Sequence, residues 1–370
     1  MSQQTGRQSR FAWILGVGLA AVLAFAPRPA SAQDAFGGPL RIRDMTPFNL
    51  LRLEMLPAQV DTRPAGSWGF DADLSWANTF IMSGNVRDYL AGHHPRRSPL
   101  TQEDVDAIFR MGQDAYYVDG EFGLLDLTAD YVFAPRSSIY LTAPLYDFTG
   151  GFLDSSIEAF HRAFSLDQQG RDLVARDRFQ SVVAIGGLHA AYLEAPARGG
   201  LGDPVLGLRH SFSLGPRWGL VLDGAVKHAI RGETSFLSTG TDDFGVQAAL
   251  QGTFARQVVY LSTSFVRTDG RVLGVRLGSR VVPTLTAAYE HTLTRHTAAI
   301  AQLYVSQSAI RDTNLSEIDA NKLELSAGLR HRRGSLEYGL AVTENIGHFE
   351  NTPDIAISAS LAWHPPHPSR

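Results

Sequence analysis

The chain has 370 residues, of which 44% are hydrophobic and 19% are charged, and its net charge is −4. This composition excludes a disordered chain, which needs low hydrophobicity and high net charge. The absence of cysteine excludes disulfides, thiolate metal sites, cysteine nucleophiles and a lipidated cysteine. A mildly acidic chain also lacks the clustered basic residues that bind nucleic acid, so we expect no nucleic-acid partner.

The N-terminus has the features of a secretory signal. Arg7 and Arg10 precede an apolar stretch from Phe11 to Ala26, and an Ala-Ser-Ala site ends at Ala32. The apolar stretch is short for a membrane-spanning helix, which needs about 20 residues. We therefore expect residues 1–32 to be a signal peptide that is cleaved after secretion.

A two-residue alternation of apolar and polar side chains dominates the rest of the chain, as in strands that place successive side chains on opposite faces. The alternating segments are long enough for a tilted strand to cross a bilayer, whereas ordinary strands average about 5–6 residues. Their polar faces carry charges in mid-strand, which suits a wet lumen. The sequence therefore predicts an all-β fold, a transmembrane antiparallel β-barrel in the bacterial outer membrane.

The connections between these segments are alternately short and long, which is the pattern of outer-membrane barrels with periplasmic turns and extracellular loops. Counting the strands between these connections gives twelve, at about 67–80, 117–134, 138–148, 202–213, 217–229, 243–255, 257–268, 283–293, 296–306, 322–332, 335–344 and 354–363. Segments 180–193 and 271–280 also alternate, and counting both as spanning gives fourteen strands. Because that count breaks the alternation of connections, we expect hairpin arms or extended loop segments there.

The predicted organisation has four parts. Residues 1–32 are the signal peptide, 33–66 an N-terminal segment that is periplasmic or lumenal, 67–363 the barrel and 364–370 a short tail.

The long loop 149–201 is predicted to contain a short amphipathic helix. Its apolar residues are spaced as one helical stripe. Together with the preceding Phe152, they are candidates for a gate or plug at the barrel mouth: Leu153, Ile157, Phe160 and Phe164. A helix that only packs on neighbouring loop residues fits the pattern equally well. Thr101 and Asp104 indicate the N-terminus of a second loop helix.

Three segments carry a resemblance to a known family. They are "GGFLDSSIEAFHRAF" (150–164), "GLGDPVLGLRHSFSLGPRWGL" (200–220) and "ENIGHFENTPDIAISASLAW" (344–363). They resemble the uncharacterised proteobacterial family called domain of unknown function 3187, which implies an outer-membrane barrel without an assigned activity. One departure is the tail after Trp363, where outer-membrane proteins commonly end on the aromatic residue itself. Recognition by the assembly machinery would then depend on an internal strand end.

Ionisable residues on the predicted inner face include eight acids and four bases. They are Asp71, Asp73, Asp126, Asp130, Arg209, Asp223, Lys227, Glu290, Lys322, Glu324, Arg330 and Glu337. They could fill a narrow lumen with salt bridges, or line a channel whose fixed charge selects solutes.

No enzyme, cofactor or metal site is predicted. The sequence contains no G-x-S-x-G elbow and no H-E-x-x-H spacing. His210 and Ser211 are a candidate pair for a lipid hydrolase, but adjacent strand residues point to opposite faces.

The function expected first is a passive channel or transporter for small solutes with a loop-occluded lumen. The alternatives are a plugged structural or adhesion barrel and, third, an outer-membrane lipid hydrolase. The expected partners are outer-membrane lipid, the assembly machinery and an unidentified small solute, and the oligomeric state stays open.

Overall fold

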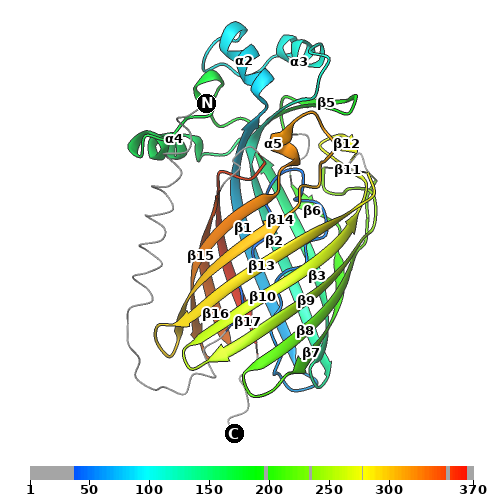
Figure 1. Ribbon diagram of the computed structural model, residues 1–370, viewed down its shortest axis with the longest axis vertical. Helices are drawn as coiled ribbons and strands as arrows, with labels where there is room; N and C mark the ends of the chain where they lie inside the picture. The colour runs from blue at the N-terminus through cyan, green and yellow to red at the C-terminus, as the bar shows by residue number, and fades with distance from the viewer. Residues whose placement is uncertain (1–36, 196–198, 233–235, 277, 347–350, 365–370) are drawn as a thin grey trace.

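The computed structural model describes residues 37–195, 199–232, 236–276, 278–346 and 351–364. Within these residues, twelve antiparallel strands close into one barrel (Figure 1). They are β1 (Trp68–Met82), β2 (Ala115–Ala134), β3 (Ser137–Thr149), β7 (Val205–Ser213), β8 (Trp218–Lys227), β9 (Asp243–Phe254), β10 (Gln257–Thr268), β13 (Arg280–Thr292), β14 (Thr297–Ser306), β15 (Lys322–Arg333), β16 (Leu336–Asn345) and β17 (Ile355–Trp363). β17 pairs with β1, which removes the sheet edges. The predicted fold and strand count are confirmed.

The apolar and polar side chains that alternate in sequence lie on the outer and inner faces of the barrel wall. In β9, the side chains of Phe244 and Val246 are 53% and 60% exposed on the outer face, whereas Asp243 and Gln247 are buried on the inner face. The same pattern repeats around the wall, where exposed leucines and valines alternate with buried polar residues. The outer surface is therefore apolar, and the inner surface is polar.

The two ends of the barrel differ. At one end, here called the short-turn end, tight connections join β2 to β3, β7 to β8, β9 to β10, β13 to β14 and β15 to β16. Outward aromatic rings gather near it, with Trp68 4.9 Å from Tyr131 and Trp218 5.8 Å from Phe254 between ring centroids. Such rings suit a membrane interface. The opposite, long-loop end carries the helices (Figure 1).

The long-loop end contains short elements. They are α2 (Gly84–His93), α3 (Gln102–Phe109), α4 (Asp154–Ala163), η2 (Arg171–Leu173), α5 (Ser316–Asp319), β4 (Gln180–Ile185), β5 (Leu188–Tyr192), β6 (Gly200–Leu201), β11 (Arg271–Val272) and β12 (Val275–Arg276). Thr101 and Asp104 form a capping box at the start of α3. In the described part of the chain, no helix is long and apolar enough to cross a membrane.

The two ambiguous segments form hairpins outside the barrel wall. β4 and β5 pair with each other, and β4 pairs with residues 115–119 of β2, which precede the part of β2 that pairs with β3. β11 and β12 form a separate two-stranded sheet in a loop. The count of twelve strands therefore holds, and fourteen is excluded.

Residues 37–66, here called the lumenal segment, lie inside the barrel. The segment enters near β13 and β15, where Arg330 donates hydrogen bonds to the carbonyl oxygens of Gly38 and Pro39. It turns at 46–52 near the long-loop end and returns to the short-turn end, where the Gly66 N–H donates to the Val132 carbonyl. The predicted signal peptide, 1–32, and residues 365–370 of the predicted tail lie outside the described residues.

Candidate functional site: the occupied lumen

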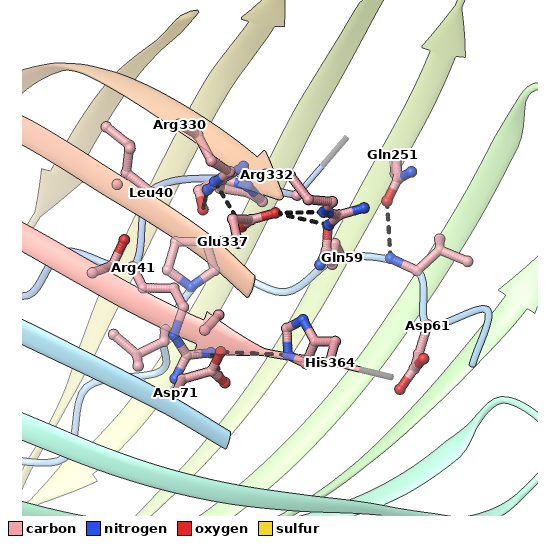
Figure 2. A pocket seen from close by; sticks show the side chains of 18 of the residues that line it. Leu40, Arg41, Gln59, Asp61, Asp71, Gln251, Arg330, Arg332, Glu337 and His364 are labelled. Carbon is pink, nitrogen blue, oxygen red and sulfur yellow. Dashed lines mark hydrogen bonds and ion pairs between the residues drawn. The ribbon is translucent and has the colours of Figure 1, made fainter. Parts of the chain in front are cut away.

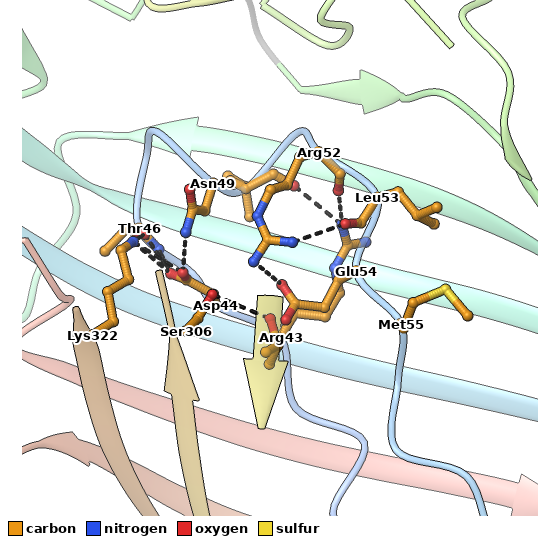
Figure 3. Close-up of polar contacts among 12 residues, drawn as sticks. Arg43, Asp44, Thr46, Asn49, Arg52, Leu53, Glu54, Met55, Ser306 and Lys322 are labelled. Atoms are coloured by element: carbon orange, nitrogen blue, oxygen red, sulfur yellow. Dashed lines mark hydrogen bonds and ion pairs between the residues drawn. The ribbon is translucent and has the colours of Figure 1, made fainter. Parts of the chain in front are cut away.

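Ion pairs join the lumenal segment to the wall. Lys322 Nζ lies 2.9 Å from Asp44 Oδ2, and both side chains are at most 2% exposed. Arg43 Nη1 lies 3.2 Å from Asp126 Oδ1 on β2. Figure 3 shows Lys322, Asp44 and Arg43 together at the turn of the segment. Because removing a charge from water is costly, each of these buried charges is stabilised by its partner.

The wall also provides hydrogen bonds for the backbone of the lumenal segment. Asp243 Oδ2 accepts from the Leu53 N–H at 2.8 Å, and Gln251 Oε1 accepts from the Val60 N–H at 2.9 Å. Gln247 Nε2 donates to the Met55 carbonyl at 3.0 Å. The segment forms no helix or strand, so its buried backbone groups need partners from elsewhere. Inward polar side chains of the strands provide them.

Inward glycines leave room for the lumenal segment. A Cβ at Gly245 would lie 2.5 Å from Met55 Sδ and 2.9 Å from Leu53 Cδ2. A Cβ at Gly219 would collide with the Val60 side chain. The wall and the segment therefore fit each other sterically as well as in charge.

All twelve residues predicted on the inner face lie there, and most are paired. Arg209 Nη2 lies 2.8 Å from Asp223 Oδ2, and Lys227 Nζ lies 3.0 Å from Asp243 Oδ2. Arg330 lies 3.3 Å from Glu290 and 3.0 Å from Glu337. Asp71, Asp73, Asp126, Asp130 and Lys322 pair with residues of the lumenal segment, while Glu324 Oε1 is buried and has no hydrogen-bond partner among the described residues.

The partners of these side chains that were not predicted come from residues 37–66. They are Arg41, Arg43, Asp44, Arg52, Glu54, Asp61 and Arg63. One signal could have indicated them: the predicted wall has twice as many acids as bases, and buried acids need cations. The four arginines of the lumenal segment are the cations that lie nearest to the wall strands in sequence.

A cavity of about 2030 Å³ occupies the half of the lumen at the short-turn end (Figure 2). It is lined by the short turns, by the parts of the strands next to them and by both arms of the lumenal segment. It extends inward as far as Arg43 and Glu54. Beyond these residues an apolar cluster closes the barrel. In that cluster Phe48 and Leu51 of the segment pack with the loop residues Leu237, Val275 and Ile310.

One group of side chains at the cavity has the geometry of a cation site. The ligand atoms of Asp71, Asp130 and His364 lie within 4.8 Å of one another. However, Arg63 donates a hydrogen bond to Asp130, and Arg41 lies 4.0 Å from Asp71. Each of these two carboxylates already has a guanidinium partner, so the group forms part of the ion-pair network.

The predicted loop gate lies elsewhere. Its helix forms as α4, but Asp154 at the start of α4 accepts hydrogen bonds from Asn78 and Arg171, and Asn78 points outward from β1. Glu121, outward on β2, accepts from the Leu153 N–H. Ile157 is buried, whereas Phe152, Phe160 and Phe164 are 66%, 44% and 53% exposed. The structure therefore differs from the gate alternative and agrees with a helix that packs on its neighbours, because α4 lies to the side of the long-loop end, next to the ends of β1 and β2, and not over the lumen (Figure 1).

The hydrolase pair is also separated. Ser211 is buried inside, where its hydroxyl accepts from the Asp61 N–H, while His210 is outside. His210 Nδ1 lies 2.7 Å from Ser137 Oγ on β3. Thr297 and His331 make a similar cross-strand contact at 3.0 Å, so the first contact is one of two such pairs near the short turns.

The family model described as "Protein of unknown function (DUF3187)" matches residues 98–364. The chain belongs to this family. The match begins within the loop that follows β1, so the lumenal segment of this DUF3187 chain lies outside it. No curated protein matches the chain.

Several solved structures are similar to the DUF3187 chain. The COG4313 outer membrane channel from Pseudomonas putida F1 is 10% identical, with a TM-score of 0.50 over 84% of this chain and 100% of that one. The NanC porin is 8% identical, with a TM-score of 0.40 over 80% and 98%. The toluene transporter TbuX of Ralstonia pickettii is 10% identical, with a TM-score of 0.38 over 93% and 99%. The first likeness supports the barrel fold, and the other two carry no further argument.

Proposed function

We propose that the chain is an outer-membrane channel for small solutes, with the short-turn end in the periplasm and the lumenal segment as a plug that closes it. The observation that carries this proposal is a closed barrel, apolar outside, whose charged interior leads to an open cavity at one end. The likeness to an outer-membrane channel supports it at the level of fold. A twelve-stranded lumen is narrow, so a small solute is the cargo that fits.

A displaceable plug agrees with the chemistry of the contacts. The segment has no strand pairing with the wall and is held by side-chain hydrogen bonds and ion pairs. Each such bond contributes modestly to stability, because the groups regain water when released. A segment held in this way can leave while the barrel stays closed.

The plugged structural or adhesion barrel is the second candidate, and the apolar closure at the long-loop end favours it. In that case the lumenal segment would be a permanent core of the molecule. The two functions differ in whether the barrel ever conducts ions.

The test is to displace the plug without removing a charge. Gly245→Leu places a side chain where Leu53 and Met55 lie, and we expect conductance steps in planar bilayers to become larger or at least tenfold more frequent than in the wild type. The matched control is Gly224→Leu on β8, which points outward and has its nearest neighbour atom 4.0 Å away. If Gly245→Leu folds and exposes the segment to trypsin, yet both variants stay silent, the barrel is structural.

A further inference from the structure

The short turns share a feature: each carries an arginine in the turn or at its edge that lines the cavity. This arginine ring consists of Arg136, Arg217, Arg256, Arg295 and Arg332. The first four come from the turns after β2, β7, β9 and β13, and Arg332 lies at the end of β15. Because the five turns follow the barrel rim, their arginines surround the mouth of the cavity.

The carboxylates that line the cavity are already paired with other cations. Arg63 pairs with Asp61 and Asp130, and Arg41 with Asp71 and Asp73. Asp126, Glu54 and Glu337 have Arg43, Arg52 and Arg330 as partners. The cavity is lined by ten arginines against seven carboxylates, so the charge that remains is positive.

That excess charge lies at the ring. Arg136, Arg217, Arg256 and Arg295 have no ion pair with any described residue. Arg256 Nε is buried and lacks a hydrogen-bond partner within the described chain. Arg136, Arg217 and Arg295 are exposed. Guanidinium groups stay protonated at any ordinary pH and offer donors that match carboxylate and phosphate oxygens.

We infer that the arginine ring selects small anionic solutes, such as carboxylates and phosphate or sulfate esters, at the periplasmic mouth. This inference rests on the proposed channel and names its substrate class. Low-dielectric walls lined by charge of one sign raise the local concentration of counter-ions. The rim attracts an anion, and the paired charges deeper inside leave the interior close to neutral. The twelve ionisable residues of the predicted wall, eight acids and four bases, have a negative net charge, which is opposite in sign to the charge at the ring.

The binding experiment uses the full chain in neutral detergent with pyranine, a fluorescent aromatic trisulfonate. We expect pyranine to bind with an affinity that falls steeply as salt rises, because the contacts are between exposed charges. The ring variant combines Arg136→Asn, Arg217→Gln, Arg256→Gln and Arg295→Gln. Asparagine is chosen at the first position because Arg136 has a φ of 64°, a conformation that asparagine tolerates. This variant should bind pyranine at least tenfold more weakly.

The matched control removes four arginines at the long-loop end: Arg87, Arg110, Arg178 and Arg276, each changed to Gln. All four are exposed and none lines the cavity, so the total charge changes equally while the mouth keeps its ring. The control should bind pyranine as the wild type does. Equal losses in both variants would overturn the inference, because net charge alone would then explain the binding.

Ion selectivity in planar bilayers separates this inference from the channel itself. Under a tenfold gradient of KCl across a neutral phosphatidylcholine bilayer, the reversal potential should show preference for chloride in the wild type, and the ring variant should lose it. A conducting but cation-selective barrel would overturn the ring and leave the channel intact. If neither the wild type nor Gly245→Leu conducts, yet the wild type still binds pyranine, the proposed channel is wrong and the ring remains an anion site. Binding of phosphatidylglycerol in place of pyranine would identify the ring as a lipid contact and overturn the solute class.

Discussion

Lys322 and Asp44 show how single residues hold the lumenal segment in place. They are 278 positions apart in sequence, and their charged atoms lie 2.9 Å apart. Asp44 also accepts hydrogen bonds from the Thr46 N–H and from the Asn49 side chain. A carboxylate with this many donors is fully satisfied, and its position fixes the turn of the segment.

Lys322→Met is expected to lower the free energy of unfolding by about 3–5 kcal/mol, since it leaves Asp44 buried without its cation. Urea unfolding of the barrel in lipid vesicles measures the change. Adding Asp44→Asn should restore most of the loss, because asparagine carries no charge. Arg96→Met is the control, as Arg96 and Asp172 form an exposed pair at 68% and 41% exposure, and such pairs contribute about 0–1 kcal/mol. Equal losses in Lys322→Met and Arg96→Met would contradict the assignment.

At the scale of elements, α4 is held by charge on one side and left apolar on the other. Glu158 is 1% exposed and receives Arg97 and Arg176, each at 2.6 Å, and Arg162 at 3.3 Å. Burial acts to raise the pKa of Glu158, but hydrogen bonds from Arg176 and Arg97 outweigh it and hold the pKa at about 2. Arg162 and Arg176 belong to the loop 149–201 itself, and Arg97 belongs to the loop between β1 and β2. Glu158 therefore acts as a clamp that holds α4 to the rest of its own loop and to the neighbouring loop.

This clamp should release in acid. Because the pKa of Glu158 in the folded protein lies below the usual value of about 4.3, the stabilisation is complete above pH about 4.5 and is lost as the pH falls toward 2. Pepsin cleavage within residues 151–176, compared between the wild type and Glu158→Gln at each pH, measures this opening. The wild type should be cleaved more slowly than Glu158→Gln at pH 5, and the difference between the two rates should become small at pH 2. A constant ratio between the two proteins over this range would show that Glu158 does not hold the loop.

At the scale of the whole molecule, the contents of the lumen differ between the two ends of the barrel. The long-loop end holds an apolar cluster, and the short-turn end holds the cavity. The lumenal segment joins them, since its turn contributes Phe48 and Leu51 to the cluster and its arms line the cavity. Any route through the molecule must pass this segment.

Trypsin reports whether the segment is inside. Arg43 and Arg52 are 7% and 1% exposed, so trypsin should leave both bonds intact in the folded wild type. Gly245→Leu should permit cleavage after Arg52 while the barrel keeps its heat-modifiable migration on a denaturing gel. Rapid cleavage after Arg52 in the folded wild type would mean that the segment does not occupy the lumen in solution.

The sequence by itself determined the wall. Alternating side chains and alternating connection lengths predict twelve strands and the inward direction of residues such as Asp126 and Glu290, because both patterns are local and depend only on the two-residue period of a strand. Only the tertiary structure decided what fills the lumen inside that wall. The lumenal segment has no period, and its pairs, such as Asp44 with Lys322, join residues far apart in sequence. The tertiary structure also decided that α4 lies outside the lumen. An amphipathic stripe predicts that a helix packs on one face, but it does not predict which side of a sheet the helix packs on.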